Sequence, residues 1–476
     1  MVSPRSYPRP SVLLLFATLV FAAAFCCVSF AQQATAPATP SVPSANKAGG
    51  ADFAATADEV LAQMSQITGL QSRSPLKKTL RSRQEIRAHV IQEMNEDKNP
   101  AERYAGARSA EAFGLLPKGF DLDSFMVDLL TEQIAGLYDP KAHEFYVADW
   151  IPIEDQRMVM AHELTHALED QHFAIEDWVK AARPNDDSEL AREAVLEGSA
   201  MAAMVEYLLQ GSGRTLQDLP DIDPAMLIGD MADTPLLKKA PAFLKDALIF
   251  PYLSGLTFSA AILKPTGWEG LPAIFTKPPV STQQILHPAL YRSGKVPESL
   301  ALPSLEKALG PEWTKLEENV MGEFGWKEVL KQFLGEPRAK PLSAAWDGDR
   351  YAVYEQKQTK RLVLITRERL TTQEQAERFF GQYSEALEKK HEKRSTLFRK
   401  PNFFSFETPE GSVYLRCLAR ECVTLEGGDR ALFLKLNKDL EWGPFPEAPK
   451  ALAKEIKEIA SCKPAAEHAL SAVTVR

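Results

Sequence analysis

Three side chains with the chemistry of a metal site stand together in the segment His162-Glu163-Leu164-Thr165-His166. The surrounding residues, Glu154 to Phe173, are predicted to form a helix, and histidines four residues apart on a helix lie on the same face. Two such imidazoles can bind one Zn²⁺ ion, which keeps a position open for water when the protein supplies only three ligands. Glu163 follows the first histidine and is placed to take a proton from that water as a general base.

The helix that carries this motif is predicted to be buried. An apolar stripe at helical spacing runs along it, formed by Met158, Ala161, Leu164 and Leu168. Burying two histidines without a partner is costly, which argues against a chance match or a solvated pair. The pattern therefore favours a metal-binding pair.

The third ligand is not part of the motif, and His172 is the first candidate for it. It has the spacing of the last histidine in the pattern HExxHxxGxxH, but Glu169 stands where that pattern needs glycine. If the helix continues, His172 lies roughly 9 Å further along the axis than His166 and about 120° away from it. We therefore expect His172 to be a polar residue at a helix C-terminus.

Glu193 and Glu197 are the other candidates, both on the next predicted helix, residues 188–210. Glu197 fills a gap in an apolar stripe, so it is expected to be buried, and a metal ion is the partner that it lacks. Gly198 follows it and allows a second helix to approach closely. Glu193 continues a polar line, which indicates a solvated face or a contact to a zinc-binding histidine. We favour Glu197 and keep Glu193 as the alternative.

An HExxH helix followed by Glu-Gly-x-Ala on a later helix resembles the gluzincin metallopeptidases, and the wider sequence is similar to a group of bacterial metallopeptidase-like proteins. That similarity covers most of residues 75–355 and rests on five segments: 134–140, 162–173, 196–200, 279–288 and 346–351. It implies His162, His166 and Glu197 as zinc ligands and Glu163 as the base, without implying a substrate. The thermolysin branch matches less well, and there Glu193 would be the ligand.

Peptide hydrolysis also needs a donor for the oxyanion and a partner for the substrate backbone. The resemblance implies a downstream Tyr or His for the first task, and the candidates are His287 and Tyr291, with Tyr252 behind them. His287 lies in a loop bounded by prolines, where it can serve as a catalytic group or only bond backbone atoms. The strand Phe145 to Ala148 precedes the motif helix; as an edge strand it would pair with an extended peptide, but its pattern equally fits an ordinary strand inside a sheet.

The N-terminus has the pattern of a secretory signal peptide. Arg5 and Arg9 precede an apolar run, residues 11–28, and small residues before Gln32 predict cleavage after residue 31. A retained membrane anchor formed by residues 11–28 is the alternative, although the run is short for a span. Residues 32–51 are predicted to be a flexible Ala/Pro/Thr-rich tether. We expect a secreted or periplasmic protein with no other membrane-spanning stretch.

The charge balance argues against nucleic acid as a partner. Lys and Arg number 55 and Asp and Glu 64, a formal net charge of −9. Loss of Arg5 and Arg9 with the signal peptide leaves 53 basic residues against the same 64 acids, or −11. An acidic chain without a basic cluster is a poor nucleic-acid binder. The sequence leaves the oligomeric state open.

Three cysteines follow the signal peptide. Cys417 and Cys422 flank a short turn between two strand-like runs, so a disulfide across a hairpin is predicted in an oxidising compartment. Cys462 is left over, and none of the three has the spacing of a zinc ligand.

The predicted fold class is α+β. Residues 52–300 are expected to form a mostly helical, zincin-like catalytic domain with a small sheet, and residues 301–476 a smaller α+β module of unknown role. Helices are predicted at 54–67, 76–96, 100–113, 122–137, 154–173, 188–210, 243–262, 305–333, 372–391 and 449–460. Strands are predicted at 143–149, 351–355 and 361–367, with more strands up to 436, and 346–351 as a glycine-containing turn.

These features together predict a secreted or periplasmic zinc metallopeptidase that binds one Zn²⁺ per chain and acts on peptides or proteins. The alternative is a zinc-binding scaffold or interaction protein with a vestigial peptidase site. An intact Glu163 argues against that alternative, because a structural zinc ion needs no base.

Overall fold

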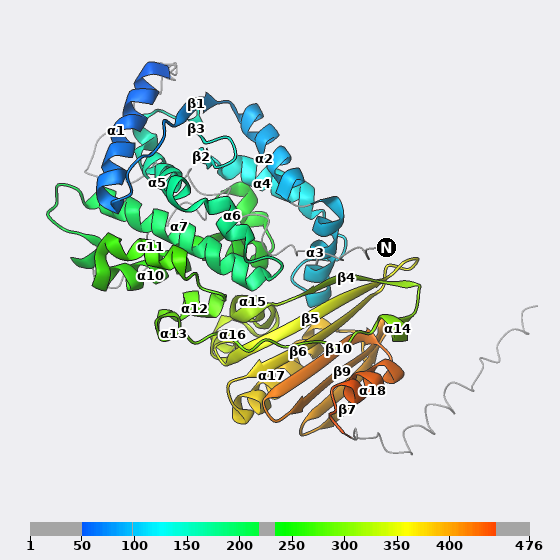
Figure 1. The fold of residues 1–476 in the computed structure, drawn as a ribbon. Coiled ribbons are helices and arrows are strands. Elements are labelled where there is room, and N and C mark those ends of the chain that lie inside the picture. The colour runs from blue at the N-terminus through cyan, green and yellow to red at the C-terminus, as the bar shows by residue number, and fades with distance from the viewer. Residues whose placement is uncertain (1–49, 98, 219–233, 444–476) are drawn as a thin grey trace, which may run out of the picture.

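A computed structural model describes residues 50–97, 99–218 and 234–443 of the chain (Figure 1). The predicted signal peptide, nearly all of the tether, Cys462 and the helix expected at 449–460 lie outside these residues. The described fold is α+β, as predicted: a helical region with a small sheet is followed by a larger sheet.

The helical region comprises the elements up to residue 293. Its first part contains α1 (Gly50–Thr68), β1 (Lys77–Arg81), α2 (Arg83–Asp97), α3 (Pro100–Phe113), α4 (Leu122–Gln133), β2 (Gly136–Asp139) and β3 (Glu144–Ala148). Then follow η3 (Glu154–Gln156), α5 (Arg157–Phe173), α6 (Ile175–Lys180), α7 (Asp186–Leu209), η4 (Leu216–Asp218), α9 (Pro235–Lys239) and α10 (Ala242–Thr266). It ends with η6 (Gly267–Gly270), α11 (Leu271–Thr276), α12 (Thr282–Leu286) and α13 (Pro288–Ser293).

The sheet region forms the lower half of the molecule in Figure 1. It contains α14 (Glu306–Leu309), β4 (Trp313–Asn319), α15 (Gly322–Leu334), α16 (Glu336–Ser343), β5 (Trp346–Gln356) and β6 (Leu362–Leu370). These are followed by α17 (Gln373–Lys390), β7 (Ser395–Lys400), β8 (Phe403–Thr408), β9 (Gly411–Leu418), β10 (Glu421–Gly428) and α18 (Arg430–Asp439). One hydrophobic core runs from the helical region into this one, so the two share buried side chains.

The small sheet has the order β1-β3-β2, with β1 parallel and β2 antiparallel to β3. The prediction that residues 145–148 form an edge strand was therefore wrong. All five residues of β3 are buried, because the strand has a neighbour on each side. The edge strands of this sheet are β1 and β2, and β2 is the one that packs against the motif helix α5.

The large sheet is antiparallel, with the order β4-β5-β6-β10-β9-β8-β7. Alternate residues of its strands face opposite sides. Leu415 of β9 belongs to the core that includes α17, whereas its neighbour Tyr414 stacks on Phe433 of α18 with ring centroids 4.6 Å apart. Helices therefore cover both faces of this sheet.

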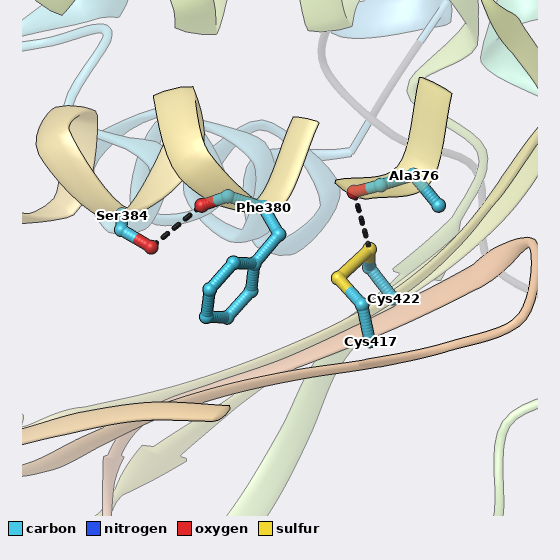
Figure 2. Close-up of a disulfide and its surroundings, with 5 residues drawn as sticks. All are labelled: Ala376, Phe380, Ser384, Cys417 and Cys422. Carbon is cyan, nitrogen blue, oxygen red and sulfur yellow. Dashed lines mark hydrogen bonds between the residues drawn. A yellow bond between two sulfur atoms is a disulfide. The ribbon is translucent and has the colours of Figure 1, made fainter. Parts of the chain in front are cut away.

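The predicted disulfide between Cys417 and Cys422 is confirmed. The two cysteines are direct partners in the register of β9 and β10, and their Cα atoms lie 4.0 Å apart. Figure 2 shows Cys422 facing the carbonyl oxygen of Ala376 on α17, 3.9 Å from its Sγ atom. The disulfide thus joins the hairpin on the face of the sheet that α17 covers.

Two predicted helices in the helical region are shorter than expected. Residues 77–81 form β1 and not the start of a helix. Helix α2 begins only after Ser82, where Ser82 and Glu85 make the reciprocal hydrogen bonds of a capping box. Helix α4 ends at Gln133, because the chain turns there into β2 at the sheet. Gly136 allows that turn to pack closely, since a Cβ atom there would lie 2.6 Å from the Val159 side chain.

Three predictions in the sheet region were also wrong. The helix predicted at 305–333 is interrupted by β4, which begins soon after Gly310 (φ 83°) and Pro311 and pairs with β5. Residues 346–351 form the start of β5 with a bulge near Gly348, not a turn between elements. The last predicted strand segment, up to 436, contains α18, whose N-terminus is capped by Asp429. For β4 and β5, hydrogen bonding between the strands of the sheet outweighed the local sequence pattern.

Among the described residues, Ala242–Thr276 is one stretch long and apolar enough to cross a membrane by length and composition. No membrane-spanning stretch was predicted from the sequence beyond the N-terminal run. More than half of its most apolar window (56%) is buried inside the protein, and α10 packs along α7. A core helix has the same composition, so this stretch is weak evidence for a membrane span.

Candidate metal centre

Helix α5 places the two histidines of the motif side by side. The helix was predicted at these residues, and it carries His162 and His166 one turn apart, with their Nε2 atoms 3.2 Å apart. Both side chains are buried, at 2% and 9% exposed. Each ring therefore directs its Nε2 atom to the same point.

Helix α7 brings Glu197 to that point. Its Oε2 atom lies 3.0 Å from Nε2 of His162 and 3.6 Å from Nε2 of His166. One ligand atom from each of the three side chains lies within 4.8 Å of the others. Ligand atoms bound at 2.0–2.2 Å around a tetrahedral zinc ion are roughly 3.4 Å apart. The donor types and their spacing therefore fit one Zn²⁺ ion.

Two glycines bring α10 close to α7 next to Glu197. Gly198 on α7 and Gly255 on α10 meet where the two helices cross, and a Cβ atom on Gly198 would lie 2.1 Å from the Gly255 backbone. The prediction that small residues after Glu197 allow close helix packing is confirmed. Because α10 lies so close, Tyr252, one turn before Gly255, also reaches the metal centre.

Glu163 lies beside the three ligand side chains and is 5% exposed. Its Oε2 atom accepts a hydrogen bond of 2.9 Å from the backbone N–H of Tyr138 on β2. Burial raises the pKa of Glu163, and the negative charge of Glu197 raises it further against the effect of the two histidines. A carboxyl group with a raised pKa is suited to take up and return a proton.

Glu169 is a site residue whose role the sequence analysis missed. It is fully buried on α5, and its Oε2 atom lies 3.3 Å from Nδ1 of His166, while Ser199 of α7 donates a hydrogen bond to its other oxygen. Burial opposes a charge on His166, but Glu169 and Glu197 raise the pKa of its imidazole well above the ordinary value. The i,i+3 spacing from His166 was the available signal. Such contacts orient a ligand histidine.

Tyr252 packs against the metal centre from α10. Its ring stacks on the His162 ring with centroids 5.9 Å apart and an interplanar angle of 27°. Burial raises the pKa of Tyr252 well above its ordinary value, and Glu197 and Glu163 add to this effect. Its hydroxyl therefore stays protonated and can act as a donor. Of the three downstream candidates, Tyr252 is the one that the fold brings to the motif.

His287 and Tyr291 have other partners. The Nε2 atom of His287 lies 2.8 Å from Oε1 of Glu323, and Tyr291 donates its hydroxyl to the carbonyl oxygen of Lys277. The Glu323 contact raises the pKa of His287, against the effect of burial. Neither side chain lines the cavity at the metal centre among the described residues. The catalytic role of His287 stays a prediction.

The other two ligand candidates also lie apart from the convergent group. His172 is near the end of α5, and its Nε2 atom lies 2.8 Å from the carbonyl oxygen of Gln71. Helix α5 runs through Glu169, as expected where glycine is missing. Glu193 is buried on α7 and lines the same cavity as Glu197, one turn earlier. It is not one of the three side chains whose ligand atoms converge with the motif histidines.

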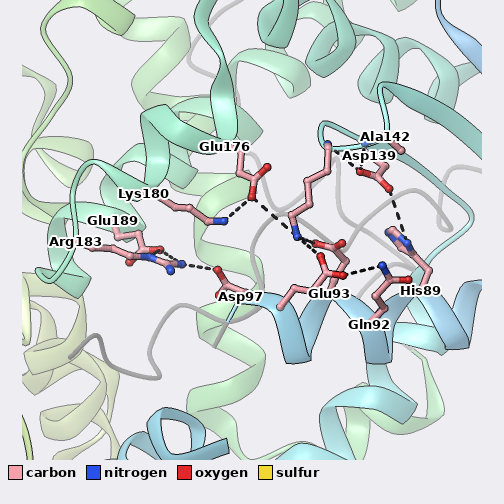
Figure 3. A network of polar contacts seen from close by, with 12 residues as sticks. His89, Gln92, Glu93, Asp97, Asp139, Ala142, Glu176, Lys180, Arg183 and Glu189 are labelled. Carbon is pink, nitrogen blue, oxygen red and sulfur yellow. Dashed lines mark hydrogen bonds and ion pairs between the residues drawn. The ribbon is translucent and has the colours of Figure 1, made fainter. Parts of the chain in front are cut away.

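A cavity of about 110 Å³ opens next to the metal centre, and His166 and Glu197 lie in its wall. Ion pairs lie in one part of the wall, as Figure 3 shows. Arg183 bridges Asp97 at 2.6 Å and Glu189 at 2.8 Å. The wall thus combines acidic and basic side chains from α2, α6 and α7 with apolar ones such as Leu137 and Ile175.

Comparison with known families gives one match. A family model described as a domain of unknown function (DUF8575) matches residues 312–431, which run from β4 into the first turn of α18. This segment is the large sheet with its helices, and it contains none of the three convergent ligands. No curated protein and no solved structure matches the chain.

Proposed function

We propose that this protein is a zinc-dependent metallopeptidase. The observation that carries the proposal is the convergence of His162, His166 and Glu197 on one point beside the buried carboxyl group of Glu163. Zinc bound there supplies Lewis acidity for a peptide carbonyl and activates water near neutral pH. This donor set, two imidazoles and one carboxylate, is that of catalytic zinc sites, which keep an open position.

The residues around the metal have separate tasks in this proposal. Glu163 accepts the proton of the attacking water and delivers it to the leaving amine. The N–H of Tyr138 holds one oxygen of Glu163, which leaves the other free for the proton. Glu169 orients His166 through Nδ1. Tyr252 is the donor that replaces His287 in this scheme, because its ring lies on His162.

Strand β2 is the proposed partner of the substrate backbone. It is at the edge of the small sheet, and the N–H of Tyr138 points away from β3 toward Glu163. An extended peptide that paired with this outer edge would lie beside the general base, and to do so it has to displace the bond between the Tyr138 N–H and Glu163 on a strand that is buried in this structure. The role that was predicted for residues 145–148 thus passes to residues 136–139.

An extracytoplasmic location is part of the proposal. The disulfide between Cys417 and Cys422 is typical of an oxidising compartment and agrees with the signal peptide. N-terminal sequencing of the mature protein tests this. A chain that begins at Gln32 supports a secreted or periplasmic protein, whereas a retained 11–28 run identifies an anchor.

One observation favours the second candidate, a zinc-binding scaffold. The three candidate ligand side chains are all at least nine-tenths buried, as in a structural metal site, which needs no access for a substrate.

The decisive experiment compares wild type with Glu163→Gln and Glu197→Gln for zinc content and for chelator-sensitive cleavage of unfolded casein. A peptidase loses zinc in Glu197→Gln, whereas Glu163→Gln keeps zinc but cleaves at least about 100-fold more slowly. Glu193→Gln and His172→Ala are controls that should keep their zinc. Zinc without cleavage in wild type supports the scaffold, and no zinc in any form refutes both functions.

A further inference from the structure

A second group of metal-ligating side chains lies in the wall of the same cavity. His89 and Glu93 stand one turn apart on α2, and Asp139 ends β2. One ligand atom from each lies within 4.8 Å of the others. Figure 3 shows the three side chains, with His89 and Asp139 facing each other.

His89 is buried without a hydrogen bond among the described residues. The side chain is 7% exposed, and its Nδ1 atom lies 3.9 Å from Oδ2 of Asp139, beyond hydrogen-bonding distance. The edge of its ring packs on Tyr146 of β3, with centroids 5.5 Å apart, which holds its orientation. His89 also lies in the wall of the cavity, so its imidazole can reach an ion bound there. The 3.9 Å gap resembles the spacing of two ligands around one ion.

Asp139 is held in the orientation of a ligand. Its Oδ1 atom accepts hydrogen bonds from the backbone N–H groups of Lys141, at 2.9 Å, and Ala142, at 3.0 Å. These bonds fix the carboxylate and direct Oδ2 toward His89. Second contacts that orient a ligand in this way are a regular feature of metal sites.

Lys141 does not neutralise the group. Its ammonium lies 2.7 Å from Glu93, 3.0 Å from Glu96 and 4.0 Å from Glu176. Lys180 also pairs with Glu176, so two cations face three carboxylates, and Asp139 adds a fourth negative charge close by. When Glu93 turns toward a metal ion, Lys141 keeps Glu96 and Glu176 as partners. The charge of this part of the cavity wall therefore favours a further cation.

We propose that His89, Glu93 and Asp139 bind a second divalent transition metal, Zn²⁺ or Mn²⁺. One imidazole and two carboxylates are a donor set that both ions accept. The ion would join α2 to the end of β2, next to Tyr138, whose N–H binds Glu163. Its role is to hold the strand that positions the general base. This site does not depend on the proposed peptidase activity.

The proposal is tested by measuring the metal bound to untagged protein that was purified without a refolding step. The protein is dialysed to equilibrium against Zn²⁺ alone and Mn²⁺ alone, and bound metal per chain is measured. We expect about two zinc ions in wild type, one in Glu93→Gln, one in Glu197→Gln and none in the double variant. Glu96→Gln is the matched control: it removes another carboxylate from Lys141 and keeps two ions.

Two results overturn the second site. One is a wild-type protein with a single zinc ion that Glu93→Gln retains. The other is His89→Gln that is folded by circular dichroism and binds as much metal as wild type. His89→Gln also decides the case if Glu93→Gln fails to fold. Loss of an ion in Glu197→Gln alone would support the first metal centre while refuting the second, so the two proposals fail separately.

Discussion

Two buried carboxylates, one in each half of the molecule, meet opposite surroundings. Glu197 of the helical region and Glu426 of the sheet region are 3% and 4% exposed. Glu426 lies 2.6 Å from Nε2 of His391 and 2.7 Å from Nζ of Lys390, both near the end of α17. Glu197 faces two imidazoles and the hydroxyl-bearing ring of Tyr252.

The difference shows two ways to bury a negative charge. In the sheet region, the chain supplies its own cation: burial opposes ionisation, but Lys390 and His391 lower the pKa of Glu426 to about 2. At the candidate metal centre, burial opposes ionisation of Glu197, but His162 and His166 lower its pKa, and the same two imidazoles can bind a metal ion together with the carboxylate. The first arrangement gives stability without a ligand, and the second makes stability depend on one.

Among the changes that test this comparison, removal of zinc is expected to have the largest effect on the free energy of unfolding. At about a thousand times its Kd, zinc should stabilise the protein by about 4 kcal/mol, and chelator should remove this gain. The measurement is urea unfolding of wild type with zinc and with chelator. Glu197→Gln should show a smaller zinc effect than wild type, whereas Glu426→Gln should keep the full effect. Equal zinc effects in Glu197→Gln and wild type would show that Glu197 does not bind the ion.

Acid should remove the stability that Glu426 contributes. Its pKa is about 2 in the folded protein against 4.5 as the ordinary value, so the carboxylate stabilises the fold above pH 4.5. About 3 kcal/mol is lost as the pH falls from 4.5 toward 2. Unfolding free energy of the metal-free protein, measured from pH 6 to 2.5, tests this. Glu426→Gln should weaken the acid dependence, and an unchanged profile would contradict the assignment.

Matched glycine substitutions, one on a helix of each region, should have smaller effects of opposite sign. Gly198→Ala puts a Cβ atom 2.1 Å from the Gly255 backbone and should cost about 2 kcal/mol and weaken zinc binding. Gly381 on α17 has nothing within 4 Å of that position, so Gly381→Ala should raise the stability by about 0.5–1 kcal/mol. Thermal unfolding and zinc titration measure both. Unchanged stability in Gly198→Ala would show that α7 and α10 separate easily.

Local sequence was sufficient where one element carries its own signal. The motif helix, the hairpin disulfide and the long helix of Glu197 were predicted because period, spacing and cap residues act within a few residues. Strands β1 and β4 were missed, since their residues also fit helices and only pairing with β3 and β5 selects the extended form. The capping box at Ser82 and Glu85 marks the start of α2 and so the end of β1, and it could have been recognised in the sequence.

The sequence by itself determined the histidine pair of α5, because four residues of helix place His162 and His166 on one face. It also indicated Glu197, as a carboxylate in an apolar stripe. Only the tertiary structure decided which partners surround them. Tyr252 reaches His162 because Gly198 and Gly255 let α7 and α10 cross closely. The backbone N–H of Tyr138 binds Glu163 because β2 packs at an edge of the small sheet. Contacts between segments far apart in the chain depend on how helices and strands pack, which no local pattern contains.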